Sequence, residues 1–283
     1  LQLSNVFNRA EEISINWIGN KQQKTLNINY NTPYVFNTNF NFESKFSLIR
    51  KDSTYVNSQI ETNIGYLFKN NVTIGSILNF EKSNVTNQNV NTFIKNYSKV
   101  FYGISFKYHL LEKNHISNKS LNFEAKATIG NRKNNTIKTD QEQFFLKFSY
   151  LQKLTKNNYL YLKSNSAYLA TDSSFDNEHY KIGGFNSLRG FNEESIHTTK
   201  YTTNSLEYHY LTNRDSYLYS FFDLGIINSN IDKSTMNLYG FGIGYNFFTN
   251  NSLINMAYAL GKFNKSPIKF QNSKFHIQIS YFF

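Results

Sequence analysis

One stretch of the chain combines residue types that point to a specific interaction. It runs from Tyr180 to Phe191 as YKIGGFNSLRGF and lies in one of the two longest segments without strand periodicity. The pair Gly183-Gly184 permits positive φ and a close approach of backbones, so this stretch can fold back tightly. Arg189 then lies in a partly packed setting, where an unpaired guanidinium is costly. The sequence therefore predicts that Arg189 forms an ion pair with a carboxylate.

Two acidic residues are candidate partners for Arg189. In the segment 215–227, alternate residues form an apolar face, and Asp223 occupies the other face. Glu207 has the same position in the preceding segment. If the apolar faces contact lipid, both carboxylates point inward. Two interpretations stay open: the pair only holds the Arg189 stretch in place, or it also takes part in assembly or gating.

The sequence gives no support to other kinds of chemistry. The chain has no cysteine, which excludes disulfide scaffolds, thiolate metal sites and cysteine nucleophiles. Its six histidines lack metal-ligand spacing, and no serine lies in a nucleophile elbow. The net charge of +11 comes from scattered lysines without the basic cluster that nucleic-acid binding needs, and it suits anionic lipid headgroups. We expect no enzyme, no metal, no cofactor and no nucleic-acid partner.

Alternation of apolar and polar residues dominates the chain and predicts β-strands. No stretch approaches the roughly 18 apolar residues of a membrane helix. One of the alternating segments contains Gly240, Gly242 and Gly244. We interpret them as a stripe of small residues that makes room for an inserted loop, and not as a phosphate-binding loop. About fifteen such segments occur, near 1–8 and then over 11–19, 24–34, 36–50, 53–69, 71–83, 98–110, 119–131, 141–153, 158–171, 202–212, 215–227, 236–248, 252–262 and 274–283.

The length of these segments favours a transmembrane antiparallel β-barrel of all-β class. A soluble β-sandwich, the alternative, has strands of about 5–6 residues. The predicted strands here run about 10–15 residues, long enough to cross a bilayer at a tilt. The mean hydropathy of −0.52 does not contradict this, because the lumen face of a barrel is polar.

The motifs resemble those of the BamA/TamA superfamily of outer-membrane insertases and translocases. GGFNSLRGF is similar to the family's (V/L)RG(F/Y) signature in loop six, FFDLG to its F-x-D-x-G strand motif, and NYNTPYVF to its NPY strand. The resemblance covers essentially the whole chain and is strongest over 180–283. Arg189, Gly190, Phe191 and Asp223 match the family positions residue by residue, Glu207 matches more weakly, and Gly183, Gly184 and Leu188 complete the loop motif.

The resemblance implies a barrel of sixteen strands whose loop enters the lumen and whose arginine pairs with the inner wall. About fifteen predicted strands imply that the first strand and the family's POTRA domains lie upstream, so that 1–283 is the barrel domain of a longer protein. In the family, the first and last strands meet at a weak seam that opens laterally. The last strand here is 274–283, in which we expect five residues to face lipid: Phe275, Ile277, Ile279, Tyr281 and Phe283.

By this resemblance we expect a non-enzymatic protein of the bacterial outer membrane that inserts or translocates other β-rich proteins. Its partners would be outer-membrane lipids, unfolded barrel or secreted proteins, and accessory assembly proteins. Three alternatives stay open: a two-partner-secretion translocator with one dedicated substrate, the membrane anchor of a patatin-like hydrolase, and a passive porin.

Overall fold

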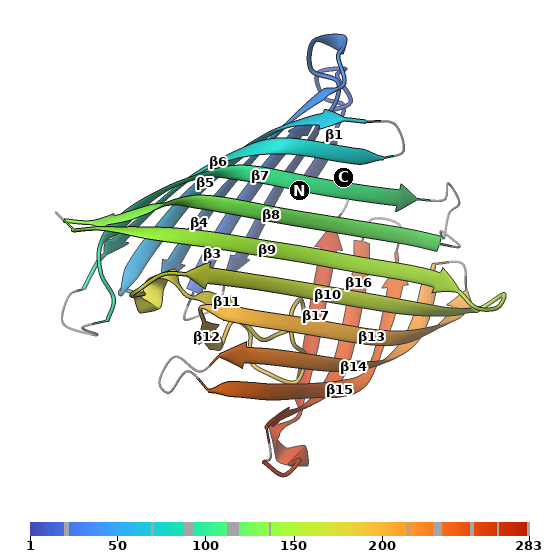
Figure 1. Cartoon of the computed structure of the whole chain (residues 1–283). Helices are drawn as coiled ribbons and strands as arrows, with labels where there is room; N and C mark the ends of the chain where they lie inside the picture. The colour runs from blue at the N-terminus through green and yellow to red at the C-terminus, as the bar shows by residue number, and fades with distance from the viewer. Residues whose placement is uncertain are drawn as a thin grey trace.

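Fifteen strands pair side by side, each antiparallel to the next, and the sheet curves into a barrel in the computed structural model (Figure 1). This confirms the predicted all-β antiparallel barrel and its strand number. The structure describes residues 1–19, 23–68, 71–87, 93–111, 119–135, 137–213, 215–228, 234–249, 252–264 and 266–281. Within these residues, no helix is long or apolar enough to cross a membrane.

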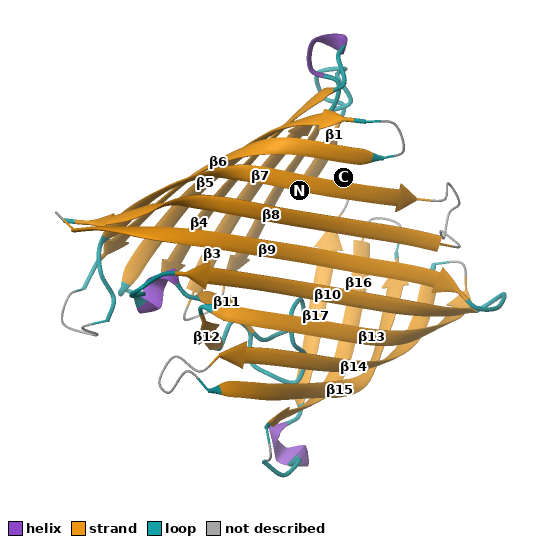
Figure 2. Cartoon of the chain, viewed as in Figure 1, coloured by secondary structure: helices purple, strands orange, loops and turns teal. Residues whose placement is uncertain are grey.

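The strands of the main sheet follow one another in chain order, and two further short strands lie between the tenth and eleventh of them. Among the described residues, three single-turn 3-10 helices occur in loops: η1 (Val35–Asn37), η2 (Asp176–Glu178) and η3 (Phe270–Asn272) (Figure 2). The strands are β1 (Gln2–Ser4), β2 (Glu12–Gly19), β3 (Gln23–Thr32), β4 (Phe40–Lys51), β5 (Tyr55–Leu67), β6 (Val72–Val85), β7 (Tyr97–Leu111), β8 (Lys119–Asn134), β9 (Ile137–Lys153), β10 (Asn158–Ala170), β11 (Tyr180–Ile182), β12 (Ile196–Thr198), β13 (Lys200–Asn213), β14 (Ser216–Asn228), β15 (Thr235–Phe248), β16 (Ser252–Phe263) and β17 (Lys274–Tyr281).

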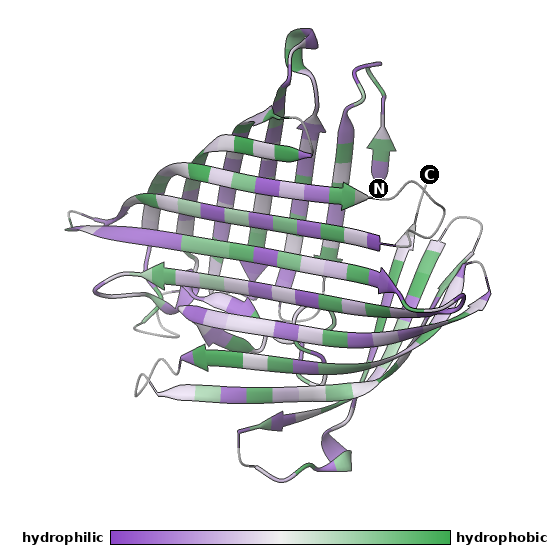
Figure 3. Ribbon diagram, turned by 45° about the vertical axis from the view of Figure 1, so that its right-hand side comes forward, coloured by the Kyte–Doolittle hydropathy of each residue, from purple (hydrophilic) through white to green (hydrophobic). Residues whose placement is uncertain are grey.

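The two faces of the sheet are opposite in character. On β7, Tyr102 and Ile104 point outward and are 55% and 65% exposed. Lys99 and Phe101, which alternate with the outward residues, are buried. Hydrophobic and hydrophilic residues alternate in this way along most strands (Figure 3). Large apolar side chains on the outside and polar side chains inside are the arrangement that a lipid environment favours.

Several charged side chains on the inner wall form ion pairs with one another. The Lys107 ammonium on β7 forms an ion pair with Glu43 on β4. The Lys126 ammonium on β8 lies 2.5 Å from the Glu61 carboxylate and 3.3 Å from that of Glu124. Because an unpaired charge is costly away from bulk water, such pairs allow a polar lumen without a large electrostatic penalty.

The sheet has two ends that lack a strand partner among the described residues. β1 pairs only with β2, from Gln2 opposite Ser14 to Ser4 opposite Glu12, and β17 pairs only with β16. Unpaired strand edges expose N–H and C=O groups, which can accept a further strand.

One predicted strand begins later than the alternation indicated. The expected strand 36–50 begins at Phe40, because the chain first makes a loop that contains η1. Pro33 cannot donate a ladder hydrogen bond, and Tyr34 and Phe36 adopt left-handed backbone with φ of 54° and 52°. The NYNTPYVF stretch is therefore partly strand and partly loop.

Other boundaries differ where polar residues continue a ladder or where the ladder stops early. β8 and β9 extend beyond the predicted 119–131 and 141–153, and their pairing continues to Asn134 opposite Ile137. Backbone hydrogen bonds need no apolar side chains, so alternation could not reveal these pairs. At the start of the chain, the segment expected near 1–8 contributes only the three residues of β1.

We predict that a charge on the outer face is tolerated only near the ends of the barrel. Ile104→Arg, in the middle of β7, should lower the free energy of unfolding by about 2–4 kcal/mol, because the guanidinium would lie in hydrocarbon. The matched control Ile137→Arg, at the tip of the β8–β9 hairpin, should cost about 0–1 kcal/mol. Denaturant unfolding in lipid vesicles measures both values, and equal costs would contradict the assignment of the outer face to lipid.

Candidate functional site

The segment between β10 and β13 folds into the barrel. We call residues 171–199 the lumen loop. Within it, β11 and β12 pair antiparallel, from Tyr180 opposite Thr198 to Ile182 opposite Ile196. Both short strands and the loop that joins them lie behind β13 and β14 in Figure 1, on the inner side of the sheet. This small hairpin carries the stretch that contains Arg189.

The tip of the lumen loop is a tight turn that depends on glycine. Gly183, Gly184 and Gly190 have φ of 108°, 94° and 88°, a region that other residues rarely adopt. The Gly183 N–H donates to the Ser187 hydroxyl at 2.8 Å, and the Gly184 N–H donates to the Leu188 carbonyl at 3.0 Å. These bonds close the turn and direct Arg189 toward the barrel wall.

The Arg189 guanidinium and the Asp223 carboxylate of β14 form a bidentate ion pair. Nε donates to Oδ2 at 2.8 Å, Nη2 donates to Oδ1 at 2.6 Å, and the backbone N–H of Arg189 donates to Oδ2 at 3.0 Å. Asp223 is 1% exposed and Arg189 is 5% exposed. The paired fork geometry makes this the strong form of a charge-assisted hydrogen bond.

Glu207 and Ser205, both on β13, complete the surroundings of Arg189. Nη1 lies 2.7 Å from Glu207 Oε1, and Nη2 donates to Ser205 Oγ at 2.6 Å. The guanidinium carbon lies 3.7 Å from the centre of the Phe221 ring. Burial alone would lower the pKa of Arg189, but the hydrogen bonds and charge of Asp223 raise the pKa above its ordinary value. Arg189 is therefore held as a fixed cation.

Apolar packing holds the tip on the wall beside the ion pair. Phe191 meets Phe263 of β16 edge to face, with ring centroids 4.8 Å apart. The side chains of this buried cluster come from the lumen loop and from β14 and β15: Ile182, Leu188, Phe191, Ile196, Ile227 and Leu238.

Two glycines on the wall make room for the backbone of the tip. A Cβ on Gly240 would meet the carbonyl oxygen of Arg189, and one on Gly261 would meet Gly190. The stripe on β15 thus accommodates the loop only at Gly240. Cβ atoms on Gly242 and Gly244 would instead meet neighbouring strands and the rings of Phe221 and Tyr219, so the expectation for these two glycines was wrong. Gly261, on β16, was not foreseen.

The tip also contacts the last strand, through a residue that sequence analysis missed. The Gly190 N–H donates to Nε2 of His276 at 3.3 Å, which requires the neutral tautomer with its proton on Nδ1. The Phe185 ring meets the His276 ring edge to face at 6.2 Å. His276 alternates with the apolar residues of 274–283, so the period-two pattern alone was enough to place it in the lumen.

The outward residues of β17 lie as their alternation predicts. Phe275, Ile277 and Ile279 are 63%, 56% and 49% exposed. Tyr281 pairs in register with Ser252 of β16. Phe283 lies outside the described residues.

A cavity of about 770 Å³ lies beside the tip of the lumen loop. Its wall carries an aromatic group from β10, β13 and β14, in which the His209 ring stacks on Tyr217 at 4.4 Å. His209 Nε2 also lies 2.7 Å from Glu207. In the described part of the chain, no group of acidic or histidine residues is arranged to hold a metal ion. The site offers ion pairing, stacking and hydrogen bonding. Other residues that line the cavity include Tyr161, Lys163, Phe185, Arg189 and Tyr219.

Comparison with known proteins gives one family and several similar structures. The family model described as haemolysin secretion/activation protein ShlB/FhaC/HecB matches residues 68–247. No curated protein sequence matches the chain.

Three solved barrels are similar over 98% of the chain. CdiB from Acinetobacter baumannii has a TM-score of 0.71 and 15% sequence identity. CdiB from Escherichia coli has a TM-score of 0.69 and 11% identity. BamA from Haemophilus ducreyi lacking POTRA domains 1–3 has a TM-score of 0.67 and 15% identity. The chain spans 55%, 57% and 65% of those three chains, respectively.

We predict that lysine cannot replace arginine at position 189. Arg189→Met leaves the Asp223 and Glu207 carboxylates buried without a cation, so the free energy of unfolding should fall by about 3–5 kcal/mol. Arg189→Lys should recover little of it, because an ammonium cannot form the bidentate pair. Denaturant unfolding in vesicles measures both variants. An Arg189→Lys protein as stable as the wild type would show that the fork geometry contributes nothing.

A second prediction concerns the pH dependence of stability. Lys181 on β11 donates to Gln23 Oε1 at 3.1 Å, and burial lowers its pKa from 10.5 to about 8. Between these values the unfolded chain binds more protons than the folded barrel, so the free energy of unfolding should rise with pH. Wild type should therefore gain stability relative to Lys181→Met as the pH rises from about 8 to 10.5. A difference that stays constant over this range would contradict the lowered pKa of Lys181.

Proposed function

The chain belongs to the haemolysin secretion/activation protein family ShlB/FhaC/HecB, and we propose on this basis that its barrel translocates a polypeptide across the outer membrane. Its family and its fold are those of β-barrel proteins of the bacterial outer membrane, the Omp85 superfamily that also contains BamA and CdiB. Of the functions expected from the sequence, export of a secreted protein agrees best with this family.

The observation that carries the proposal is the lumen loop held across the barrel by the buried Arg189–Asp223 pair. A passive porin conducts through an open lumen and has no need of a loop tied to its wall by a desolvated ion pair. A translocator must stay closed when no substrate is present and open when one arrives. A loop fixed by a few strong, specific contacts suits that requirement, because release of those contacts opens a defined path.

The wall around Arg189 suggests how the closed state is maintained. Breaking the pair would leave Asp223 and Glu207 buried beside each other without their cation, which is strongly unfavourable. A substrate segment in the adjacent cavity can compensate by stacking on Tyr217 and by forming hydrogen bonds to the wall. We therefore propose that substrate entry and displacement of Arg189 are coupled.

Insertion of other barrels is the second candidate function, and β17 favours it, because one edge of this strand has no partner among the described residues. An edge strand in lipid must find partners for its N–H and C=O groups. His276 of β17 contacts Gly190 of the lumen loop, so release of the tip would also free the inner side of this strand. In this alternative, β17 would pair with a strand of the incoming protein.

We further propose that residues 1–283 act as the barrel domain of a longer protein. The similar barrels are longer chains, of which this chain spans 55–65%. One of them is described as lacking POTRA domains 1–3. Such domains upstream of this barrel would receive the substrate before it reaches the lumen.

Deletion of the gene in its own bacterium, followed by complementation, distinguishes the two candidates. If the barrel is a translocator, the deletion strain should lose one or a few secreted proteins from the medium while other outer-membrane barrels remain. Complementation with wild type should restore secretion, and Arg189→Met should not, although a folded barrel reaches the membrane. Quantitative mass spectrometry of medium and outer membrane gives both readouts. If the secreted proteins in the medium are unchanged and outer-membrane barrels are generally lost, the proposal of translocation is wrong and insertion is supported.

A further inference from the structure

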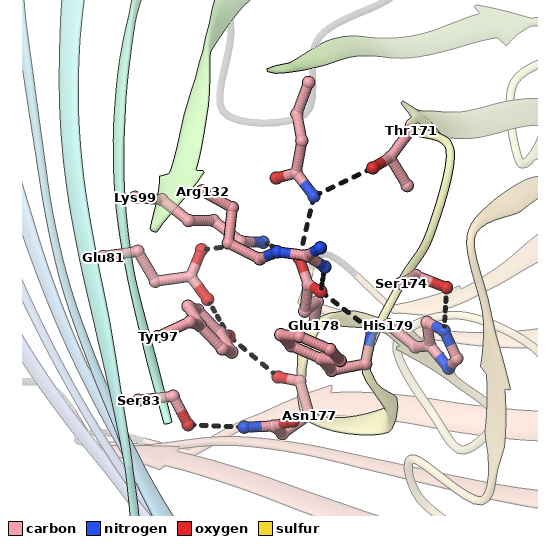
Figure 4. A network of polar contacts seen from close by, with 12 residues as sticks. Glu81, Ser83, Tyr97, Lys99, Arg132, Thr171, Ser174, Asn177, Glu178 and His179 are labelled. Atoms are coloured by element: carbon pink, nitrogen blue, oxygen red, sulfur yellow. Dashed lines mark hydrogen bonds and ion pairs between the residues drawn. The ribbon is translucent and has the colours of Figure 1, made fainter. Parts of the chain in front are cut away.

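The lumen loop has a second buried ion pair, far from Arg189 and with the charges reversed. The Glu178 side chain, at the end of η2, is fully buried (Figure 4). Its carboxylate lies 3.0 Å from the Lys99 ammonium of β7 and forms an ion pair with Arg132 of β8. It also accepts hydrogen bonds from the Gln141 side chain at 3.0 Å and from the Phe175 N–H at 2.8 Å. Two cations on the wall thus hold one carboxylate of the loop.

The neighbouring residue, Asn177, is hydrogen-bonded to the wall through both its side chain and its backbone. Its side-chain amide donates to Ser83 Oγ at 2.6 Å and to the Lys95 carbonyl at 2.8 Å. Its own carbonyl accepts from the Asn57 amide at 2.8 Å and from the Tyr97 hydroxyl at 3.0 Å. These partners come from β5, β6 and the start of β7, so the contact spreads over several strands.

Arg132 extends the contact toward the beginning of the loop. Its guanidinium donates to the carbonyl and the hydroxyl of Ser173 at 3.1 and 3.0 Å, and it lies 4.0 Å from the centre of the Phe175 ring. Gln141 of β9 donates to the Thr171 hydroxyl at 3.2 Å. The residues 171–178 are thus bound to the wall along their length. We call the hydrogen bonds of Asn177 to the wall, together with the ion pairs of Glu178 with Lys99 and Arg132, the base anchor. The contact of Arg189 with Asp223 and Glu207 is the tip anchor.

Glu178 is a carboxylate whose charge the wall stabilises. Burial raises its pKa, but Lys99, the Gln141 hydrogen bond and Arg132 outweigh burial and lower the pKa below the ordinary value. Glu178 is therefore ionised at neutral pH. Moving the base of the loop would leave Arg132 buried without its carboxylate and Lys99 with only the Glu81 carboxylate, 3.7 Å away, which is unfavourable.

Between the two anchors the chain has a point about which the tip can turn. Gly183 and Gly184 lie there, both with positive φ, and glycine moves between backbone conformations at little cost. Beyond them, Phe185, Asn186 and Arg189 border the cavity of about 770 Å³. The tip therefore has space on one side, whereas residues 171–178 are hydrogen-bonded to the wall.

We propose that the base anchor is a permanent tether and that Glu178 is a positioning residue for the Arg189 tip. When the tip anchor releases, the tip turns about Gly183-Gly184 into the cavity, while residues 171–178 stay on β5–β9. The tether returns Arg189 to Asp223 after each opening, because it confines the guanidinium to the neighbourhood of its partner. The inference rests on the proposed function, since it describes how the closed lumen of a translocator opens.

The absence of cysteine from the chain allows each anchor to be locked separately. Ser83→Cys with Asn177→Cys joins two side chains that are hydrogen-bonded at 2.6 Å and locks the base. Leu188→Cys with Gly225→Cys locks the tip, because the Leu188 side chain lies 3.1 Å from where a Cβ on Gly225 would be. A short bifunctional thiol reagent that releases its thiols on reduction closes either pair. Each purified, folded protein is measured in planar bilayers before and after reduction, so it serves as its own control.

We expect the base-locked protein to show the same opening events before and after reduction. The tip-locked protein should lack these events until it is reduced. Openings that the base lock abolishes, or that the tip lock leaves intact, would overturn the proposal. Secretion is measured separately in the complemented strain, and a wild-type gene that restores no secreted protein would contradict the proposed function. The comparison of openings before and after reduction tests the tether alone.

A charge variant tests the role of Glu178 without any cross-link. Glu178→Gln should make openings longer and more frequent, because the tip is no longer returned to Asp223, and Glu178→Asp should restore closure in part. Glu43→Gln is the matched control, since it removes a partly buried carboxylate from the Lys107 ion pair on the wall without touching the lumen loop. A purely structural effect of losing an ion pair on the wall would change both glutamine variants alike. Equal opening times in the Glu178→Gln and Glu43→Gln variants would contradict the positioning role of Glu178.

Discussion

A charge buried inside the barrel must have a partner, and this constraint determines how the lumen is built. Arg189 can enter the wall only where Asp223 and Glu207 already face inward. Its approach requires the positive-φ turn at Gly183-Gly184 and the free space at Gly240. The apolar cluster around Leu188 then packs the tip against the wall beside the pair. The loop, the strand glycines and the acidic wall are thus parts of one arrangement.

The same constraint acts a second time, with opposite sign, at Glu178. A carboxylate of the loop between two wall cations at one end, and a cation of the loop between two wall carboxylates at the other, bind the lumen loop to two separate parts of the barrel. Neither end can exchange its partners for those of the other, because like charges would then meet. The reversed polarity therefore fixes the direction in which the loop crosses the lumen, as well as its attachment.

Alternation predicted the fold and the inward faces well, since each strand has one lipid face and one lumen face. It placed Asp223 and Glu207 on the lumen side, where the structure has them. It failed where the backbone overrides the side-chain pattern. Pro33 and the left-handed Tyr34 and Phe36 interrupt a predicted strand, and the polar residues after Arg132 continue a ladder that needs no apolar side chains.

The class of fold and the order and faces of the strands follow from the amino-acid sequence, because a period of two is a local property of the chain, and the residues of the loop motif are recognisable there too. Which inward residues meet depends on the three-dimensional arrangement. Glu178 and Arg132 are 46 residues apart, and Gly190 and His276 are 86 apart. Their contacts depend on the stagger of neighbouring strands and on the path of the loop across the lumen. The alternating pattern says which way a side chain points, but not at what depth or toward which partner.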